Sequence, residues 1–497
     1  MKKLFMTMML FSLLLGSCAS SEDTTAANTD DTWEEEANDA WEEDSGYGET
    51  GVDYDDSYGD ESEDGDAYEE TVVASYPFID IYPFSEDRAW VAFGEDEYNC
   101  ILGIIDTNGK LLYQGNPVNL SSEANRNFFY VSQFQDGLAF YRGNGLSHED
   151  YEGCPCGIID SNGNVLFETQ ITPEGGYLIL AYGNGHFFVA QHIQNFDTDE
   201  WRYGTIDKNG NALNEMKPFN DEEVGLEHWA NQSKYFPTIQ YIGENFIALP
   251  SGLYNIETAQ FYAFPCSYVD YREDPIGNFC DGRTCIIDNG YFDIGAYIID
   301  TSYTGIWKDE DDELQGFVCK KDDFYSNSKY SEGLIYGYGD GIEAGYYDKD
   351  LNLAILLEQN ESIVDGGDFN GGYAAIAMRG ADGELYASMI DRQGNLLYSP
   401  VKTDGFDPDN SSNGYLQVTI DREEKIIGPN GAVYTLGVDD LSMLEGLTFG
   451  DVSNGFILMG MEEVYNKESY KYEEIPPHYV SLDGSAIIDS AKISSSP

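Results

Sequence analysis

A short glycine-containing motif recurs along most of this chain and constrains the fold more than any other feature. Its clearest copies are Gly103-Ile104-Ile105-Asp106-Thr107-Asn108-Gly109, Gly157-Ile158-Ile159-Asp160-Ser161-Asn162-Gly163 and Gly204-Thr205-Ile206-Asp207-Lys208-Asn209-Gly210. Looser copies extend the series to nine landmarks, at positions 106, 160, 207, 255, 300, 348, 391, 428 and 481, spaced by about 47 residues. Repeats of this length are typical of propellers and solenoids.

Each copy of the motif predicts a β-hairpin. An apolar strand ends at the Asp, and a second strand such as Leu111-Leu112-Tyr113 follows the glycine. We expect Asn-Gly to form a type I′ turn, and the Asp carboxylate to accept hydrogen bonds from amides across that turn. The residues to which the sequence assigns this structural role are Asp106, Asn108, Gly109, Asp160, Asn162, Gly163, Asp207, Asn209, Gly210, Asp391 and Gly394.

A second motif lies upstream of most of these hairpins and reads as a turn followed by an alternating strand. Examples are Phe84–Val91, Phe134–Phe140 and Tyr330–Tyr336. One unit therefore holds three or four antiparallel strands, which is close to the size of a propeller blade. We expect an all-β repeat architecture, either β-propeller-like with about seven to nine units or an open β-solenoid.

The pairing of the two motifs resembles the WG β-repeat family. The resemblance covers most of 78–490 and is strongest at 84–113, 134–167 and 369–398. The resemblance implies a binding or structural repeat with no general catalytic site. The tryptophan that the family places before the hairpin glycine is replaced here by Leu102, Cys156, Tyr203 and Ala344.

The first 18 residues have the layout of a secretory signal. Lys2 and Lys3 precede an apolar run that is too short to span a bilayer as a helix. The ending Leu15-Gly16-Ser17-Cys18 resembles the bacterial lipobox, which implies cleavage before Cys18 and acylation of that cysteine, for example with palmitate. We therefore predict an exported lipoprotein held by its lipid in the bacterial cell envelope or at the cell surface. The alternative is an ordinary signal peptide.

Residues 19–72 contain 22 acidic residues and no basic one. Such a segment cannot bury enough apolar surface to offset chain entropy, so we predict a disordered acidic tether between the signal and a repeat domain at 73–497. Its scattered aromatic residues leave a short partner-recognition motif as an alternative. The run Asp53–Gly59 resembles a calcium loop but has Tyr58 where the loop requires glycine.

The overall charge excludes several partners. The chain has 91 acidic and 25 basic side chains, for a formal net charge of −66. Nucleic acid is not an expected partner, because phosphate binding depends on Lys and Arg. Electrostatic attachment to an anionic membrane surface is disfavoured for the same reason.

Calcium and thiol chemistry are the weaker site candidates. Asp348–Asn352, Asp407–Asn410 and the dense run Asp309–Glu313 place oxygens close together without completing a known calcium loop. Besides Cys18 the chain has seven cysteines, and export permits disulfides. A bridge between Cys280 and Cys285 would close a hairpin, and buried free thiols are the alternative.

No catalytic residue stands out. We predict a noncatalytic binding or scaffold lipoprotein that presents a β-repeat surface to protein or glycan. The alternatives are a carbohydrate-active hydrolase using a pair of carboxylates in a propeller cleft, and a structural spacer in the envelope. Trp90, Trp201 and Trp307 fall in strand-like stretches, where packing between units is favoured over stacking on a ligand.

Overall fold

The structure is a computed structural model, and the chain divides into two units, residues 1–68 and 69–497. All described residues belong to the second unit. They are 76–96, 99–118, 128–144, 155–170, 172, 175–195, 198–218, 239–249, 252–263, 277–289, 294–303, 305, 307–308, 314–326, 328–357, 363–408, 411–412, 414–434, 444–445, 448–453, 455–460, 463–466, 471–474, 476–482, 486–490 and 493–495.

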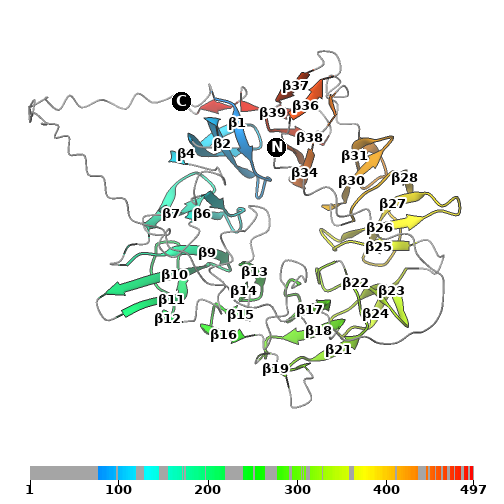
Figure 1. The fold of residues 1–497 in the computed structure, drawn as a ribbon, viewed down its shortest axis with the longest axis horizontal. Coiled ribbons are helices and arrows are strands. Elements are labelled where there is room, and N and C mark those ends of the chain that lie inside the picture. Colours follow the sequence, from blue (N-terminus) through cyan, green and yellow to red (C-terminus); the bar gives the residue numbers. More distant parts are fainter. Residues whose placement is uncertain are drawn as a thin grey trace, which may run out of the picture. The chain divides into compact units, whose positions relative to one another are not determined.

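The described residues form β-strands and no α-helix, which confirms the expected fold class. Nine consecutive antiparallel sheets of three to five strands, here blades 1 to 9, follow one another along the chain and around a ring (Figure 1). Within a blade, neighbouring strands in the sequence are also neighbours in the sheet, as in a meander. The first strand of blade 4, β13, faces the ring centre and its last strand, β16, lies outermost (Figure 1).

Blades 1 to 4 each have four strands from one stretch of chain, and blade 1 gains a fifth from the C-terminus. Blade 1 contains β1 (Phe78–Ile81), β2 (Arg88–Asp96), β3 (Asn99–Asp106), β4 (Lys110–Val118) and β40 (Ser494–Ser495). Blade 2 contains β5 (Phe128–Val131), β6 (Leu138–Asn144), β7 (Pro155–Asp160) and β8 (Val165–Gln170). Blade 3 contains β9 (Leu178–Gly183), β10 (His186–Asn195), β11 (Thr198–Ile206) and β12 (Lys217–Pro218). Blade 4 contains β13 (Gln240–Gly243), β14 (Phe246–Leu249), β15 (Gly252–Asn255) and β16 (Gln260–Ala263).

Blades 5 to 9 keep the same order, with small hairpin sheets inserted in two places. Blade 5 contains β17 (Arg283–Asn289), β18 (Ile294–Asp300) and β21 (Cys319–Asp322), with β19 (Trp307–Lys308) and β20 (Leu314–Gln315) paired separately. Blade 6 contains β22 (Ile335–Gly339), β23 (Ile342–Tyr347) and β24 (Leu353–Leu356). Blade 7 contains β25 (Ile363–Gly366), β26 (Tyr373–Arg379), β27 (Leu385–Asp391) and β28 (Val401–Thr403). Blade 8 contains β29 (Ser411–Ser412), β30 (Tyr415–Ile420), β31 (Glu423–Ile427) and β32 (Val433–Tyr434). Blade 9 contains β34 (Thr448–Ser453), β35 (Phe456–Gly460), β38 (His478–Ser481) and β39 (Ile487–Ile488), beside a sheet of β33 (Leu444–Glu445), β36 (Glu463–Asn466) and β37 (Lys471–Glu474).

The nine sequence landmarks correspond to the nine blades. In seven blades the landmark is the last residue of the third strand or the residue just after it, as at Asp106 in β3 and Asp391 in β27. In blades 5 and 6 the landmark stands at the end of the second of three strands, β18 and β23. The hairpin that follows leads to the outer strand. No two units share a blade, because each strand that ends at a landmark has its own pairing partners on both sides.

The prediction of a type I′ turn at Asn-Gly is wrong. The type I′ turn is found instead at the hairpin between the first two strands of a blade. Type I′ requires positive φ at both central residues. At Asp106–Gly109 only the glycine has positive φ (75°), and its amide donates to the Asp106 carbonyl at 2.9 Å. This is a type I turn followed by a left-handed glycine, the usual three-residue hairpin connection. By contrast, Asp136 and Gly137, between the first and second strands of blade 2, have φ of 52° and 72°, which is type I′.

Apolar side chains pack at all nine boundaries between neighbouring blades. The boundary between blades 9 and 1 closes the ring: Leu458 and Tyr479 pack with Phe84 and Val91. The Tyr479 hydroxyl donates to the Tyr82 carbonyl at 2.7 Å. In addition, β40 pairs in parallel with β4 at the outer edge of blade 1. The repeat is therefore a closed propeller, and the open solenoid is excluded.

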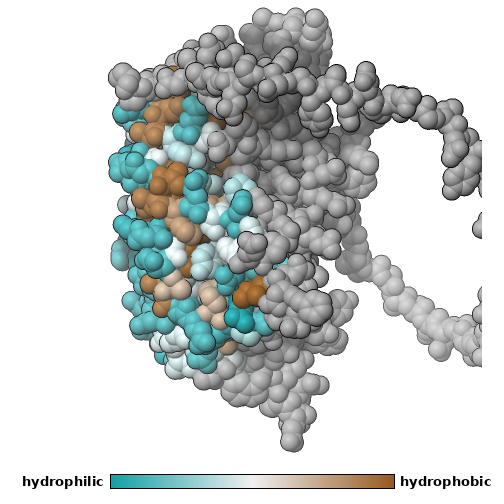
Figure 2. All heavy atoms as spheres, turned by 90° about the vertical axis from the view of Figure 1, so that its left-hand side faces the viewer, coloured by the Kyte–Doolittle hydropathy of each residue, from teal (hydrophilic) through white to brown (hydrophobic). Residues whose placement is uncertain are grey.

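The outer side of the ring mixes hydrophobic and hydrophilic residues. Figure 2 shows hydrophobic residues in separate patches between hydrophilic ones on the side that faces left in Figure 1. Val165 at the start of β8 is 37% exposed and Leu213 before β12 is 46% exposed. Single exposed aliphatic residues of this kind are normal on protein surfaces.

Candidate functional site

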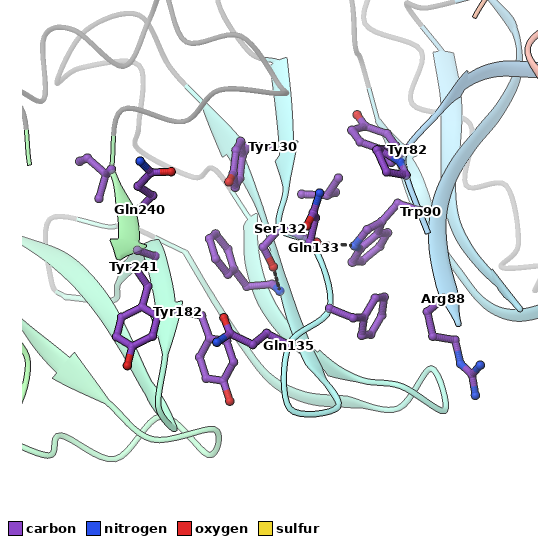
Figure 3. A pocket seen from close by; sticks show the side chains of 16 residues that line it. Tyr82, Arg88, Trp90, Tyr130, Ser132, Gln133, Gln135, Tyr182, Gln240 and Tyr241 are labelled. Carbon is purple, nitrogen blue, oxygen red and sulfur yellow. Dashed lines mark hydrogen bonds between the residues drawn. The ribbon is translucent and has the colours of Figure 1, made fainter. Parts of the chain in front are cut away.

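A cavity of about 410 Å³ lies where blades 1 to 4 meet (Figure 3). Its volume is within the range of about 300–1,000 Å³ seen for ligand pockets. The walls come from the ends of the first strands and from the turns that follow them, with contributions from β2 and β6. The lining side chains that the later argument uses are Arg88, Trp90, Gln133, Gln135, Tyr182, Gln240 and Tyr241.

Three glutamines supply most of the polar capacity of this inner cavity. Gln133 and Gln135 flank Phe134 just after β5, and both are exposed, whereas Gln240 begins β13 and is half-buried. Among the residues that the structure describes, none of these three carboxamide groups makes a hydrogen bond. Each carboxamide offers two donor hydrogens and an acceptor oxygen. The cavity therefore offers several donors and acceptors that no described protein group occupies.

The floor of the cavity is held rigid by hydrogen bonds between blades. The Trp90 indole N–H donates to the Ser132 carbonyl at 3.0 Å, and the Phe140 amide donates to the Ser132 hydroxyl at 2.9 Å (Figure 3). The Trp90 ring is stacked on Phe134, with 6.2 Å between ring centroids. Because these groups already have partners, they shape the cavity and leave recognition mainly to the carboxamides.

Two tyrosines form the wall on the side of blades 3 and 4. Tyr182 and Tyr241 lie next to each other, and both hydroxyls point the same way (Figure 3). Burial raises the pKa of Tyr182 to about 12, with the Asp136 carboxylate adding to the shift. Burial also raises the pKa of Tyr241, with smaller contributions in the same direction from Glu244 and Asp136. Both hydroxyls are therefore protonated and neutral at physiological pH.

The single basic side chain of the lining is already engaged. The Arg88 guanidinium donates from Nε to the Ser161 carbonyl at 2.6 Å and from Nη1 to the Asp87 carbonyl at 2.9 Å. It therefore joins β2 of blade 1 to the outer hairpin of blade 2. The positive charge of Arg88 lies at the cavity, and the orientation of its guanidinium is fixed by these two hydrogen bonds.

The repeat-turn residues lie in a different place from this cavity and serve the hairpins. The Asp106 carboxylate accepts hydrogen bonds from the amides of Asn108 and Lys110, at 2.8 and 2.9 Å. Asp160, Asp207 and Asp391 do the same and also accept from the side-chain amide of an Asn four residues on. Gly163, Gly210 and Gly394 have φ between 80° and 84°. These residues form turns and are not brought together into a site.

The calcium candidates do not converge in the described residues. The Asp348 carboxylate is occupied by the amides of Asp350 and Asn352, both at 2.9 Å, and Asp350 contacts the Arg283 guanidinium. Within the described part of the chain, no group of three or more His, Cys, Asp or Glu side chains is placed to hold a metal ion. The runs Asp309–Glu313 and Asp53–Gly59, and the end of Asp407–Asn410, lie outside the described residues.

The expected alternative of buried free thiols fits part of the described set. None of Cys100, Cys156, Cys280, Cys285 and Cys319 forms a disulfide; the first two and Cys285 are buried, and Cys280 and Cys319 are half-buried. The bridge between Cys280 and Cys285 is absent: Cys280 pairs with Arg283 across a tight turn, while Cys285 packs in the core between blades 5 and 6. Burial raises the pKa of Cys285 well above its ordinary value, so this thiol is unreactive.

Two of the three strand tryptophans pack between and within blades. Trp90 is 2% and Trp201 6% exposed, and Trp201 stacks on His192 with 4.8 Å between ring centroids. The predicted lipidation site Cys18 and the tether at 19–72 lie outside the described residues. Among the residues described, no helix is long and apolar enough to cross a membrane.

Of the lining residues, sequence reasoning weighed Trp90 as a candidate but did not identify the glutamines and tyrosines. Gln133 directly precedes the upstream motif that begins at Phe134, Gln135 lies within it, and Tyr182 precedes the equivalent turn of blade 3. The available signal was positional: these residues lie just before the turn that leads into the second strand of a blade. The sequence does not show which of these segments line the same cavity.

No protein-family model matches the chain, and no curated protein matches it. Solved structures that it resembles include prolyl oligopeptidase B from Galerina marginata, at 9% identity and a TM-score of 0.32, covering 80% of this chain and 56% of that one. A lectin from Burkholderia pseudomallei is similar at 9% identity and a TM-score of 0.27, covering 70% of this chain and 94% of the lectin. A polysaccharide lyase acting as an ulvan lyase is similar at 10% identity and a TM-score of 0.27, covering 86% and 96%.

Proposed function

We propose that this protein is a binding lipoprotein whose propeller presents the inner cavity of blades 1 to 4 to a glycan or protein ligand. The observation that carries the proposal is the lining of the cavity, where three carboxamides from blades 2 and 4 and two neutral tyrosines surround one space of about 410 Å³. Preformed pockets that combine apolar walls with a few convergent polar groups are the usual form of ligand sites.

The same lining argues against a hydrolase at this position. A glycosidase needs two carboxylates about 5 to 10 Å apart on either side of the scissile bond. None of the described residues that line the cavity is Asp or Glu. The proposal therefore assigns recognition and no reaction to this cavity.

The placement of the protein is part of the proposal. The lipobox at Leu15-Gly16-Ser17-Cys18 supports a lipid anchor in the bacterial envelope, and the 22 acidic residues of 19–72 support an extended tether. Labelling of growing cells with radioactive palmitate tests the anchor. Wild-type protein is expected to incorporate label and Cys18→Ser is not; equal labelling of both would contradict the lipobox assignment.

Binding by the cavity is tested with the purified full chain on a glycan array and a peptide array. Titration calorimetry then gives the affinity for each ligand found. The double variant Gln133→Ala, Gln240→Ala removes two hydrogen-bonding groups, worth about 1 kcal/mol each, so about a tenfold or greater loss of affinity is expected. Gln114→Ala, an exposed glutamine on the outer strand β4, is the matched control and is expected to bind normally.

Two results would overturn the assignment of the cavity. One is a ligand whose affinity is the same for the wild type and the double variant. The other is the absence of any ligand on both arrays. Circular dichroism and urea unfolding of the double variant show that a loss of affinity does not reflect a loss of fold.

A further inference from the structure

We propose that the inner cavity takes a neutral, hydroxyl-rich glycan and discriminates against anionic glycans. This inference rests on the proposed function, namely that the cavity of blades 1 to 4 is the ligand site. It adds the chemical class of the ligand, which is argued from the groups that line the cavity and from the charges at its edge.

The polar groups of the cavity match hydroxyls. A sugar hydroxyl donates one hydrogen bond and accepts others, and a carboxamide provides both kinds of partner from one planar group. Gln133, Gln135 and Gln240 come from blades 2 and 4, so they approach the space from two sides (Figure 3). Neighbouring hydroxyls of a sugar ring can therefore pair with the donor and the acceptor of one carboxamide.

The two tyrosines form a fixed wall beside the carboxamides. Tyr182 and Tyr241 lie next to each other on the side of blades 3 and 4 (Figure 3). Tyr182 is stacked on Phe187, with 4.3 Å between ring centroids, and the Tyr241 ring lies against Gly183, where an added Cβ would be 2.0 Å from it. Both rings are therefore fixed before a ligand arrives, which lowers the entropy cost of binding.

The charges around the cavity oppose an anion. Asp136 directly follows the lining residue Gln135, and the Glu86 carboxylate accepts hydrogen bonds from the amides of Asp136 and Gly137, so both acids lie at the cavity edge. Glu244 lies three residues after the lining residue Tyr241. These carboxylates also add to the raised pKa values of Tyr182 and Tyr241. They occupy the type I′ turns of blades 1, 2 and 4. Arg88 is the one basic side chain among the described lining residues, and its guanidinium already binds two carbonyls. The net charge of −66 on the whole chain further disfavours anionic ligands.

A charge-matched glycan series tests the class. The full chain is presented with neutral gluco-, manno-, xylo- and chito-oligosaccharides, and with oligogalacturonate beside its neutral methyl ester, at low ionic strength. At least one neutral oligosaccharide is expected to bind. Oligogalacturonate is expected to bind at least about tenfold more weakly than its neutral methyl ester. Raising the salt concentration is expected to narrow that gap, because salt screens exposed charges.

A charge-removal variant connects the selectivity to this cavity. Asp136→Asn removes one carboxylate at the cavity edge and keeps the turn, because Asn tolerates the left-handed φ of 52° at that position. The ratio of neutral to anionic affinity is expected to fall by about twofold or more. Asp281→Asn is the matched control: it occupies the same turn position in blade 5, also with φ of 52°, and is expected to leave the ratio unchanged.

The outcomes separate this inference from the function on which it rests. An anionic glycan that binds as tightly as its neutral form, or a peptide as the only ligand, would overturn the neutral-glycan assignment. If that ligand still depends on Gln133 and Gln240, the cavity remains the ligand site. If no ligand depends on those two glutamines, the proposed function itself fails. Equal effects of Asp136→Asn and Asp281→Asn would also contradict the inference.

Discussion

The carboxylate of Glu86 accepts hydrogen bonds from the backbone amides of Asp136 and Gly137, at 2.8 and 2.7 Å. Glu86 lies in the first turn of blade 1, and its partners form the equivalent turn of blade 2. The neighbouring hydroxyl of Ser85 donates to the Phe134 carbonyl at 2.6 Å. One Ser-Glu pair therefore ties the inner turn of a blade to that of the next.

The same connection recurs five blades later. The Ser331 hydroxyl donates to the Phe369 carbonyl at 2.7 Å, and the Glu332 carboxylate accepts from the Gly372 amide at 3.1 Å. Glu244 of blade 4 accepts from the Gly282 amide at 2.9 Å. The acidic residue of the upstream motif is therefore an inter-blade connector at three of the nine boundaries, and a share of the chain's acidity has this structural cause.

Removing the connector is expected to weaken the boundary between blades 1 and 2. Glu86→Ala leaves two amides without their carboxylate, and we expect a loss of about 1–2 kcal/mol in the free energy of unfolding, measured by urea titration. Glu86→Gln keeps an acceptor and is expected to lose less. Glu215→Ala, an exposed acid without such a bond, serves as control; an equal effect of Glu215→Ala would contradict the connector role.

Closure of the ring depends on Tyr479. Tyr479→Phe removes the hydroxyl that donates to the Tyr82 carbonyl at 2.7 Å, and about 1 kcal/mol of stability is expected to be lost. Hydrogen exchange is expected to rise selectively in blades 9 and 1. Tyr386→Phe removes a hydroxyl that bonds to Asp382 within blade 7, and it should leave that boundary protected. Uniform exchange changes in both variants would argue against a closure role.

Acid is expected to weaken the hairpins. Hydrogen bonds from the Asn211 side chain and then its backbone amide lower the pKa of Asp207, and the Asn395 side chain and backbone amide lower that of Asp391. A carboxyl with a lower pKa in the folded state stabilises the fold above its unfolded pKa of about 3.9, and the gain is lost as the pH falls through the folded pKa. The stability difference between the wild type and Asp207→Asn should therefore shrink between about pH 5 and pH 2. A constant difference across that range would refute the assignment.

Gly183 is expected to tolerate no side chain. An added Cβ would lie 2.0 Å from the Tyr241 ring, so Gly183→Ala should displace this wall of the cavity and lower the stability by about 1–3 kcal/mol. Ligand affinity should fall with it. At Gly405 an added Cβ meets no atom within 4 Å, and Gly405→Ala is expected to be neutral or slightly stabilising. Equal unfolding midpoints for the two variants would contradict this account.

Local interactions were accessible from the sequence because they join residues close in the chain. The Asp160 carboxylate accepts hydrogen bonds from the amides two and four residues ahead, so the need for Asp at this turn can be understood from the local sequence. The turn type was assigned wrongly for a related reason. Asn-Gly permits two turn geometries, and the choice between them depends on how the outer strand pairs, where the register shifts between Ile158 and Ile159.

The sequence alone therefore determined the all-β class, a repeat of about seven to nine units and the places where their hairpins turn, because period and turn chemistry are encoded within about 47 residues. Tertiary structure alone decided that nine blades close, that Glu86 reaches Gly137, and that Gln133 and Gln240 face one cavity. These relationships join residues about 50 to 400 positions apart. These relationships depend on the angle at which each sheet packs on the next. That angle is set jointly by the side-chain packing at all of the blade boundaries.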